Sequence, residues 1–157
     1  MLTGVRIENF KAWREADLHC QLSCVERLGS LRRYAVDAIG FDGEILDEYG
    51  RKLSYSGGPR VGDAFFKHVF NNLGHNDQMR RVPLTKSSDD GRGFDELPRN
   101  ELDPSDRICL TVAVVAHAII LNATDSDWEE QKALVDTLGV KVEQVCPHPA
   151  VKGARER

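Results

Sequence analysis

Acidic side chains gather at two places in the second half of the chain. Asp103 and Asp106 stand in an Asp-Pro-Ser-Asp segment that opens an apolar, helix-like stretch, and Asp125 and Asp127 follow the apolar run 118–124. Carboxylates that converge on one pocket repel one another unless a divalent cation lies among them, and Mg²⁺ and Mn²⁺ prefer oxygen ligands. Such ions activate water and neutralise phosphoryl oxygens. The chemistry that these residues could do is therefore hydrolysis of a phosphodiester.

Each of these acids also has an ordinary structural interpretation. The segment from Asp103 to Asp106 is typical of a helix N-terminus, with an acidic cap and a proline in the first turn. Asp125 could cap the helix that carries Trp128. Glu48, on an earlier predicted helix, could be a solvated surface acid. Spacing alone leaves capping and catalysis open.

The elements that must position the acids alternate between helical and strand-like periods. Helices are predicted over 17–33, 44–53, 61–73, 103–117 and 125–138, and strands over 34–40, 81–85, 118–124 and 140–146. Strands separated by helices imply parallel pairing, so the predicted fold is α/β with a central, mostly parallel sheet. Ligands of such sheets bind beyond the carboxyl ends of the strands, where both acidic pairs are expected. Residues 86–100 are polar and lack a period, which predicts a mobile loop.

Composition restricts the class of protein. The 157 residues fit one domain, and the net charge of −4 with mixed signs offers no broad basic surface for duplex nucleic acid. No secretory leader and no bilayer-length apolar run are found, so a cytoplasmic protein without membrane contact is expected. Its four cysteines are then expected to be reduced thiols: Cys20, Cys24, Cys109 and Cys146.

The first predicted helix carries two patterns. Cys20 and Cys24 are four residues apart and could bind a metal, but no second Cys/His pair has convincing spacing, which favours buried thiols. The apolar residues at helical spacing, which are expected to face the core, are Leu18, Leu22, Val25 and Leu28.

Several segments in order resemble a known family. The most specific are Asp103-Pro-Ser-Asp-Arg107 and Leu121-Asn-Ala-Thr-Asp-Ser-Asp-Trp128. Further matching segments are 17–28, 45–49, 58–66, 139–140 and 146–147. From about residue 16 to residue 147 the chain resembles bacterial PIN-like proteins that are encoded near ABC- or AAA-type ATPases. The resemblance implies a PIN-like domain over 16–147, followed by a charged tail over 148–157.

The resemblance also implies fold, activity and site. The expected fold is a three-layer α/β/α PIN-like fold, and the expected activity is Mg²⁺- or Mn²⁺-dependent cleavage of single-stranded RNA or another nucleic acid. Residue by residue, the family's acids match Glu48, Asp106 and Asp125 as catalytic metal ligands, with Asp127 as a further ligand. Thr124 and Arg107 are expected to contact substrate, and Asp103 to cap the helix and orient Asp106. A homodimer and a neighbouring ATPase are the implied partners.

The first fifteen residues depart from the family pattern. The family's first acid belongs at the end of a first hydrophobic strand, and residues 1–15 contain nothing like that motif. Instead Ile7-Glu-Asn-Phe-Lys11 resembles the opening strand of DNA-repair-like ATPases, although no Walker loop follows, so no nucleotide site is expected. We interpret residues 1–15 as the first residues of such an ATPase, joined by deletion to the body of a nuclease. The alternative is an atypical first strand that only resembles an ATPase start. Val5–Phe10 could fill the central strand position.

Three function classes follow. The leading one is a PIN-like metal-dependent nuclease, impaired by loss of the first acid; Asp37 is not expected to replace it, because its mid-strand place turns it from the crevice. The alternative is a non-catalytic PIN-like interaction domain or gene-fusion remnant. A receiver-like phosphoacceptor ranks below both, because that class needs a lysine after the last strand, where this chain has Cys146-Pro147.

Overall fold

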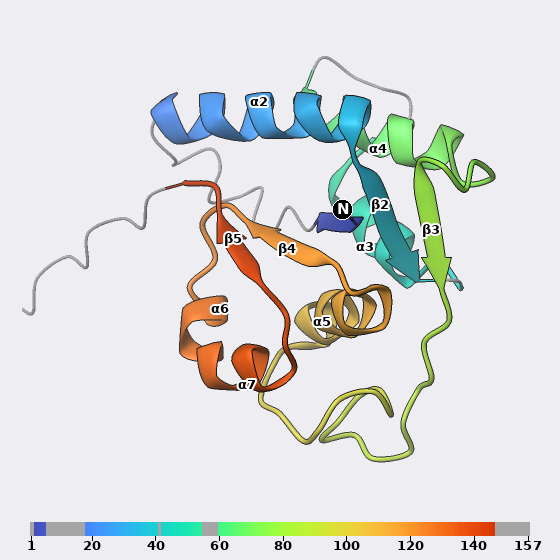
Figure 1. The fold of residues 1–157 in the computed structure, drawn as a ribbon, viewed down its shortest axis with the longest axis vertical. Coiled ribbons are helices and arrows are strands. Elements are labelled where there is room, and N and C mark those ends of the chain that lie inside the picture. Colours follow the sequence, from blue (N-terminus) through green and yellow to red (C-terminus); the bar gives the residue numbers. More distant parts are fainter. Residues whose placement is uncertain (1, 6–17, 41, 55–59, 147–157) are drawn as a thin grey trace, which may run out of the picture.

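The computed structural model describes residues 2–5, 18–40, 42–54 and 60–146. Its centre is a five-stranded sheet with the order β3-β2-β1-β4-β5, and every pairing in that sheet is parallel (Figure 1). The strands are β1 (Leu2–Val5), β2 (Val36–Gly40), β3 (Met79–Val82), β4 (Ile119–Asn122) and β5 (Val142–Gln144). The α/β class and the parallel sheet predicted from the alternating periods are confirmed.

The central strand comes from the N-terminal segment. Thr3 of β1 is aligned with Asp37 of β2 on one side and with Ile119 of β4 on the other (Figure 1). The first residues therefore do occupy the central strand position. The strand is Leu2–Val5, earlier than the expected Val5–Phe10, of which all but Val5 lies outside the described residues.

Six helices are described: α2 (Leu18–Tyr34), α3 (Glu44–Lys52), α4 (Val61–Asn71), α5 (Pro104–Ala116), α6 (Asp127–Glu130) and α7 (Lys132–Thr137). The first four agree with the predicted helices to within a few residues. The single helix predicted over 125–138 is instead two short helices, because the backbone at Gln131 (φ −97°, ψ 16°) leaves the helical region. Gly139, at φ 69°, follows α7 as the sequence predicts.

Helix α5 is the buried helix that connects the two halves of the sheet. It contacts β1, β2, β3 and β4, and Leu110 and Val112 are almost completely buried. Burying a side chain of that size contributes roughly 1.5–3 kcal/mol. The chain reverses at His117, in the left-handed region at φ 51°, and enters β4. This reversal brings the start of α5 to the carboxyl end of β4.

Helix α2 buries a different face from the one predicted. Leu18, Leu22 and Val25 are 70%, 52% and 42% exposed, so the predicted apolar stripe is wrong except for Leu28. The buried residues of α2 are Cys20, Cys24, Leu28 and Leu31. Both stripes have helical spacing. The choice between them depends on packing against α4 and the end of β5, which the local sequence does not encode.

A disulfide joins the start of α2 to the end of the sheet. Cys20 is bonded to Cys146, which lies 126 residues further along the chain, two residues after β5. Cys24 and Cys109 are buried and form no disulfide. The expectation of four reduced thiols is therefore wrong for Cys20 and Cys146. Their contact arises from tertiary packing between distant segments, which no local spacing could reveal.

Among the helices that the structure describes, none combines the length and the apolar character that a bilayer crossing requires.

Candidate metal centre

The first turn of α5 holds two of the acids. Asp103 has an extended backbone (φ −67°, ψ 163°), and its Oδ1 atom accepts a hydrogen bond from the backbone N–H of Asp106 at 2.8 Å. Pro104 occupies the first helical turn, where its missing N–H costs no helical hydrogen bond. The same Asp103 oxygen accepts from the Ser105 hydroxyl at 2.9 Å. The predicted capping role of Asp103 is confirmed.

Three carboxylates converge at this turn. One oxygen each from Asp103, Asp106 and Asp127 can be chosen so that all three lie within 4.8 Å of one another. Asp106 is fully buried, whereas Asp103 and Asp127 are exposed. Two unit charges 4.8 Å apart repel by about 3.5 kcal/mol at an effective dielectric constant near 20, before solvent screens them. A divalent cation bound by these oxygens would turn that repulsion into attraction.

Asp127 is held by a chain of hydrogen bonds from the end of β4. Its backbone N–H donates to Asp125 Oδ1 at 2.9 Å, and the N–H of Asp125 donates to Asn122 Oδ1 at 3.1 Å. The Asn122 amide donates in turn to the Asp125 carbonyl at 2.7 Å and to Gln144 Oε1 at 2.8 Å. Asn122 is 2% exposed. It is a positioning residue that the sequence interpretation missed, and its signal was a polar residue ending an apolar strand.

Asp125 and Thr124 lie in the turn between β4 and α6. The Asp125 carboxylate orders the turn before α6, and no group of three potential ligands among the described residues includes it. Asp127, expected as the additional ligand, is the acid of this turn whose carboxylate lies close to those of Asp103 and Asp106. Thr124, expected to contact substrate, is partly exposed in the turn between β4 and α6.

Glu48 forms ion pairs with residues of its own helix, α3. Its carboxylate forms ion pairs with Arg51 at 3.1 Å and with Lys52 at 2.9 Å, and its side chain is 18% exposed. Helix α3 packs against α5, but within the described chain Glu48 belongs to no group of three potential metal ligands. The structure thus brings Asp106 together with Asp103 and Asp127, and leaves Glu48 in a local ion-pair network.

Arg107, expected to contact substrate, organises the loop before α5. Its guanidinium donates to the Asp90 carbonyl at 2.6 Å, and to the Oδ1 and carbonyl oxygens of Asn100, both at 3.0 Å. Gly93, at φ 78°, lies so close that a Cβ there would be 2.8 Å from Arg107 Cδ. Phe94 is buried beneath the same loop. Where the sequence predicts a mobile loop, the structure shows an extensively hydrogen-bonded one.

Asp37 is a buried carboxylate far from the carboxyl edge of the sheet. It is the second residue of β2 and is 3% exposed. Neither carboxylate oxygen has a hydrogen-bond partner among the described residues, and burial raises the pKa of Asp37 from 3.8 to about 7. Asp37 belongs to neither group of potential metal ligands found in the described chain. The expectation that it does not replace the missing acid agrees with this position.

A pocket of about 110 Å³ lies among β4, β5, α6 and α7. It starts at the carboxyl ends of β4 and β5 and continues along α6 and α7. Its lining combines two amides, acids, one lysine and apolar side chains: Asn122, Trp128, Glu129, Lys132, Val135, Asp136, Val142 and Gln144. The lining includes Trp128, the residue after Asp127, but none of the three acids of the cluster.

The chain was compared with protein-family models, with curated proteins and with solved structures, and none of the three comparisons gives a match.

Proposed function

We propose that the protein is a PIN-like, metal-dependent nuclease that hydrolyses phosphodiesters in single-stranded RNA or another nucleic acid. The observation that carries the proposal is the convergence of Asp103, Asp106 and Asp127 at the carboxyl edge of a parallel sheet. That edge is where ligands of such sheets bind.

The donor set fits a hard divalent cation. All three side chains offer carboxylate oxygens, the ligands that Mg²⁺ and Mn²⁺ prefer, and no sulfur or nitrogen donor belongs to this group. Asp106 would be the buried anchor, and Asp103 and Asp127 the two exposed ligands that leave one side open to solvent and substrate. When bound, the ion would supply an activated water and neutralise charge on the phosphoryl oxygens.

Fold-level features support the same proposal. The resemblance implies a central, mostly parallel sheet and an acid at the start of α5. The sheet is parallel, and Asp106 lies in the first turn of that helix. The finer assignment, a three-layer α/β/α PIN-like fold with an atypical first strand, is part of this proposal. So are a cytoplasmic location, a homodimer and a neighbouring ATPase as partner.

A non-catalytic PIN-like interaction domain is the second candidate, and one observation favours it. The central strand, Leu2–Val5, contains no acid, although the family's first catalytic acid belongs at the end of that strand. Glu48, the match for the second acid, is paired with Arg51 and Lys52. With only Asp103, Asp106 and Asp127 as ligands, we expect either an impaired enzyme or an inactive domain.

A cleavage assay with matched variants separates the two candidates. The full chain is incubated with labelled single-stranded RNA in the presence of Mn²⁺, Mg²⁺ or a chelator. The nuclease proposal predicts metal-dependent cleavage that Asp127→Asn lowers at least about 100-fold, because an exposed metal ligand is lost while the fold is kept. Asp106→Asn should abolish cleavage. Asp77→Asn, an exposed acid in the turn before β3, is the control and should cleave like the parent.

Absence of metal-dependent cleavage of RNA and DNA would eliminate the nuclease. If Mn²⁺ affinity is also unchanged in Asp127→Asn, the interaction domain is the better description of the protein.

A further inference from the structure

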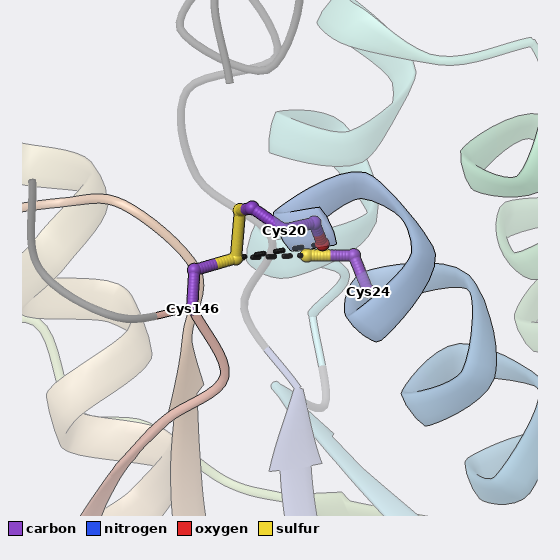
Figure 2. Close-up of side chains that lie close together, drawn as sticks. All are labelled: Cys20, Cys24 and Cys146. Atoms are coloured by element: carbon purple, nitrogen blue, oxygen red, sulfur yellow. Dashed lines mark hydrogen bonds between the residues drawn. A yellow bond between two sulfur atoms is a disulfide. The ribbon is translucent and has the colours of Figure 1, made fainter. Parts of the chain in front are cut away.

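Three cysteines from opposite ends of the described chain form a second cluster, away from the acids. Cys20 and Cys24 are one turn apart on α2, and Cys146 follows β5 (Figure 2). All three are buried, with exposed fractions of 4%, 8% and 2%. The partly buried apolar residues packed against them are Ala123 and Val145. The proposed nuclease activity does not use this cluster.

The sulfur atoms are close enough to share one ligand. Cys20 and Cys146 form the disulfide, and the Cys24 sulfur lies 3.6 Å from that of Cys146 (Figure 2). A disulfide sulfur carries no proton, so the Cys24 thiol is the donor in that contact. All three sulfurs lie within 4.8 Å of one another. Two redox states of the cluster follow: a disulfide beside one thiol, and three adjacent thiols.

We propose that reduction of the Cys20–Cys146 disulfide converts this cluster into a three-thiolate site for a thiophilic divalent cation, zinc. Tetrahedral zinc with Zn–S bonds of about 2.3 Å holds its sulfur ligands roughly 3.8 Å apart. The 3.6 Å between Cys24 and Cys146 is already close to that spacing. Only the bonded pair, Cys20 and Cys146, must separate after reduction, and Cys20 lies on the N-terminal turn of α2, where the helix begins.

The chemical steps balance with a small dithiol as the reductant. The dithiol gives two electrons and two protons, the bond between Cys20 and Cys146 breaks to leave two thiols, and the dithiol becomes a cyclic disulfide. Three Zn–S bonds then form as the three thiols release three protons. Three protein ligands leave the fourth zinc position to water or another exchangeable ligand.

The buried surroundings of the cluster require a compensating charge when its thiols become thiolates. Zinc supplies the charge that stabilises thiolates in an apolar cluster. In a reducing compartment a zinc ion would then join α2 to the end of β5, as the disulfide does under oxidising conditions.

The test uses Co²⁺ as a spectroscopic probe on the full chain, after reduction with the dithiol and its removal without oxygen. The reduced chain is expected to show a sulfur-to-cobalt charge-transfer band from Co²⁺ bound at this cluster, which Zn²⁺ then removes. The oxidised chain should show no such band. Oxygen ligands give no band of this kind, so Asp127→Asn should leave the charge-transfer band unchanged. The band therefore reports only on the cysteine cluster, and the nuclease proposal is tested separately by the cleavage assay.

Cysteine variants decide whether the signal comes from this cluster. Cys24→Ser keeps the disulfide for folding and should weaken Co²⁺ binding in the reduced state at least about tenfold. Cys109→Ser, which changes the other buried cysteine outside the disulfide, is the control and should bind like the parent. The proposal is overturned if the reduced chain gives no charge-transfer band, or if Cys24→Ser and Cys109→Ser bind Co²⁺ equally well.

Discussion

The Oδ1 atom of Asp103 accepts a hydrogen bond from the backbone N–H of Asp106 at 2.8 Å. One carboxylate of the candidate centre therefore caps the helix that carries another. The stability of the first turn of α5 and the geometry of the proposed metal site are coupled through this contact. The two roles of Asp103 can be separated by changing its charge without changing its ability to cap.

Asp103→Asn and Asp103→Ala separate capping from metal binding. Asparagine caps about as well as aspartate, so Asp103→Asn should change the free energy of unfolding little, whereas Asp103→Ala should lower it by about 1 kcal/mol. Both variants should lose Mn²⁺ affinity, because both lack the carboxylate. Urea denaturation and Mn²⁺ titration measure the two effects. If Asp103→Asn binds Mn²⁺ like the parent, Asp103 is only a cap.

Asn122 is expected to position the turn that presents Asp127. Asn122→Ala removes its buried hydrogen bonds to Asp125 and Gln144, and should lower the free energy of unfolding by roughly 1–3 kcal/mol. The control is Asn72→Ala, whose amide bonds within one turn of α4, to His68. Mn²⁺ affinity should fall in the first variant only. Equal Mn²⁺ affinities in the two variants would show that Asn122 does not position the site.

Asp103 and Asn122 show how much of the candidate site can be predicted from the sequence. The alternating periods predict the α/β class and the edge of the sheet where the acids lie, because periodicity and chain order are local properties. The partnership of Asp103, Asp106 and Asp127 is not local, since it depends on where the turn after β4 meets the start of α5. The resemblance implies Asp125 as the main ligand and Asp127 as a further one, whereas the structure groups Asp127 with Asp103 and Asp106. The sequence of an Asp-Ser-Asp turn does not determine which carboxylate orders the turn and which one projects.

Asp37 should make stability depend on pH. Burial raises its pKa in the folded state to about 7 from the model-peptide value of 3.8. Between these values the folded state keeps a proton that the unfolded state has lost, so the free energy of unfolding falls as the pH rises through this window. At about 1.4 kcal/mol per pH unit, the full loss is roughly 4 kcal/mol.

Asp37→Asn removes this titration. The variant should exceed the parent in stability above pH 7 and approach it below pH 3.8, because the aspartate is neutral in both states there. Denaturant unfolding of both proteins across the pH range measures the difference. A difference that stays constant with pH would contradict burial of an ionisable Asp37.

Reduction of the disulfide should destabilise the metal-free protein. The Cys20–Cys146 bond spans 126 residues of sequence, and closing a loop of that size restricts the unfolded chain by roughly 2–5 kcal/mol. Reduced protein in a chelator should unfold at a correspondingly lower urea concentration. The double variant Cys20→Ser/Cys146→Ser should be insensitive to reductant. An equally large effect of reductant on that variant would show that the loss has another origin.

The cysteine cluster and the buried face of α2 share one reason for escaping prediction. Leu18 and Cys20 lie on different stripes of the same helix, and both stripes have helical spacing. Which stripe is buried depends on the end of β5, more than 100 residues away, where Cys146 meets Cys20. Local periodicity predicts that a helix forms, and only the tertiary contacts decide which side of it faces the core.

The most direct test of the proposed centre is the anomalous diffraction of crystals soaked in Mn²⁺. We expect a manganese peak within ligand distance of Asp106 and Asp127, with Asp103 as a third contact, and no such peak in Asp127→Asn crystals. The parent crystals are soaked at an Mn²⁺ concentration that supports cleavage. If they then contain no manganese at the cluster, the assignment of these three acids as a metal centre is contradicted.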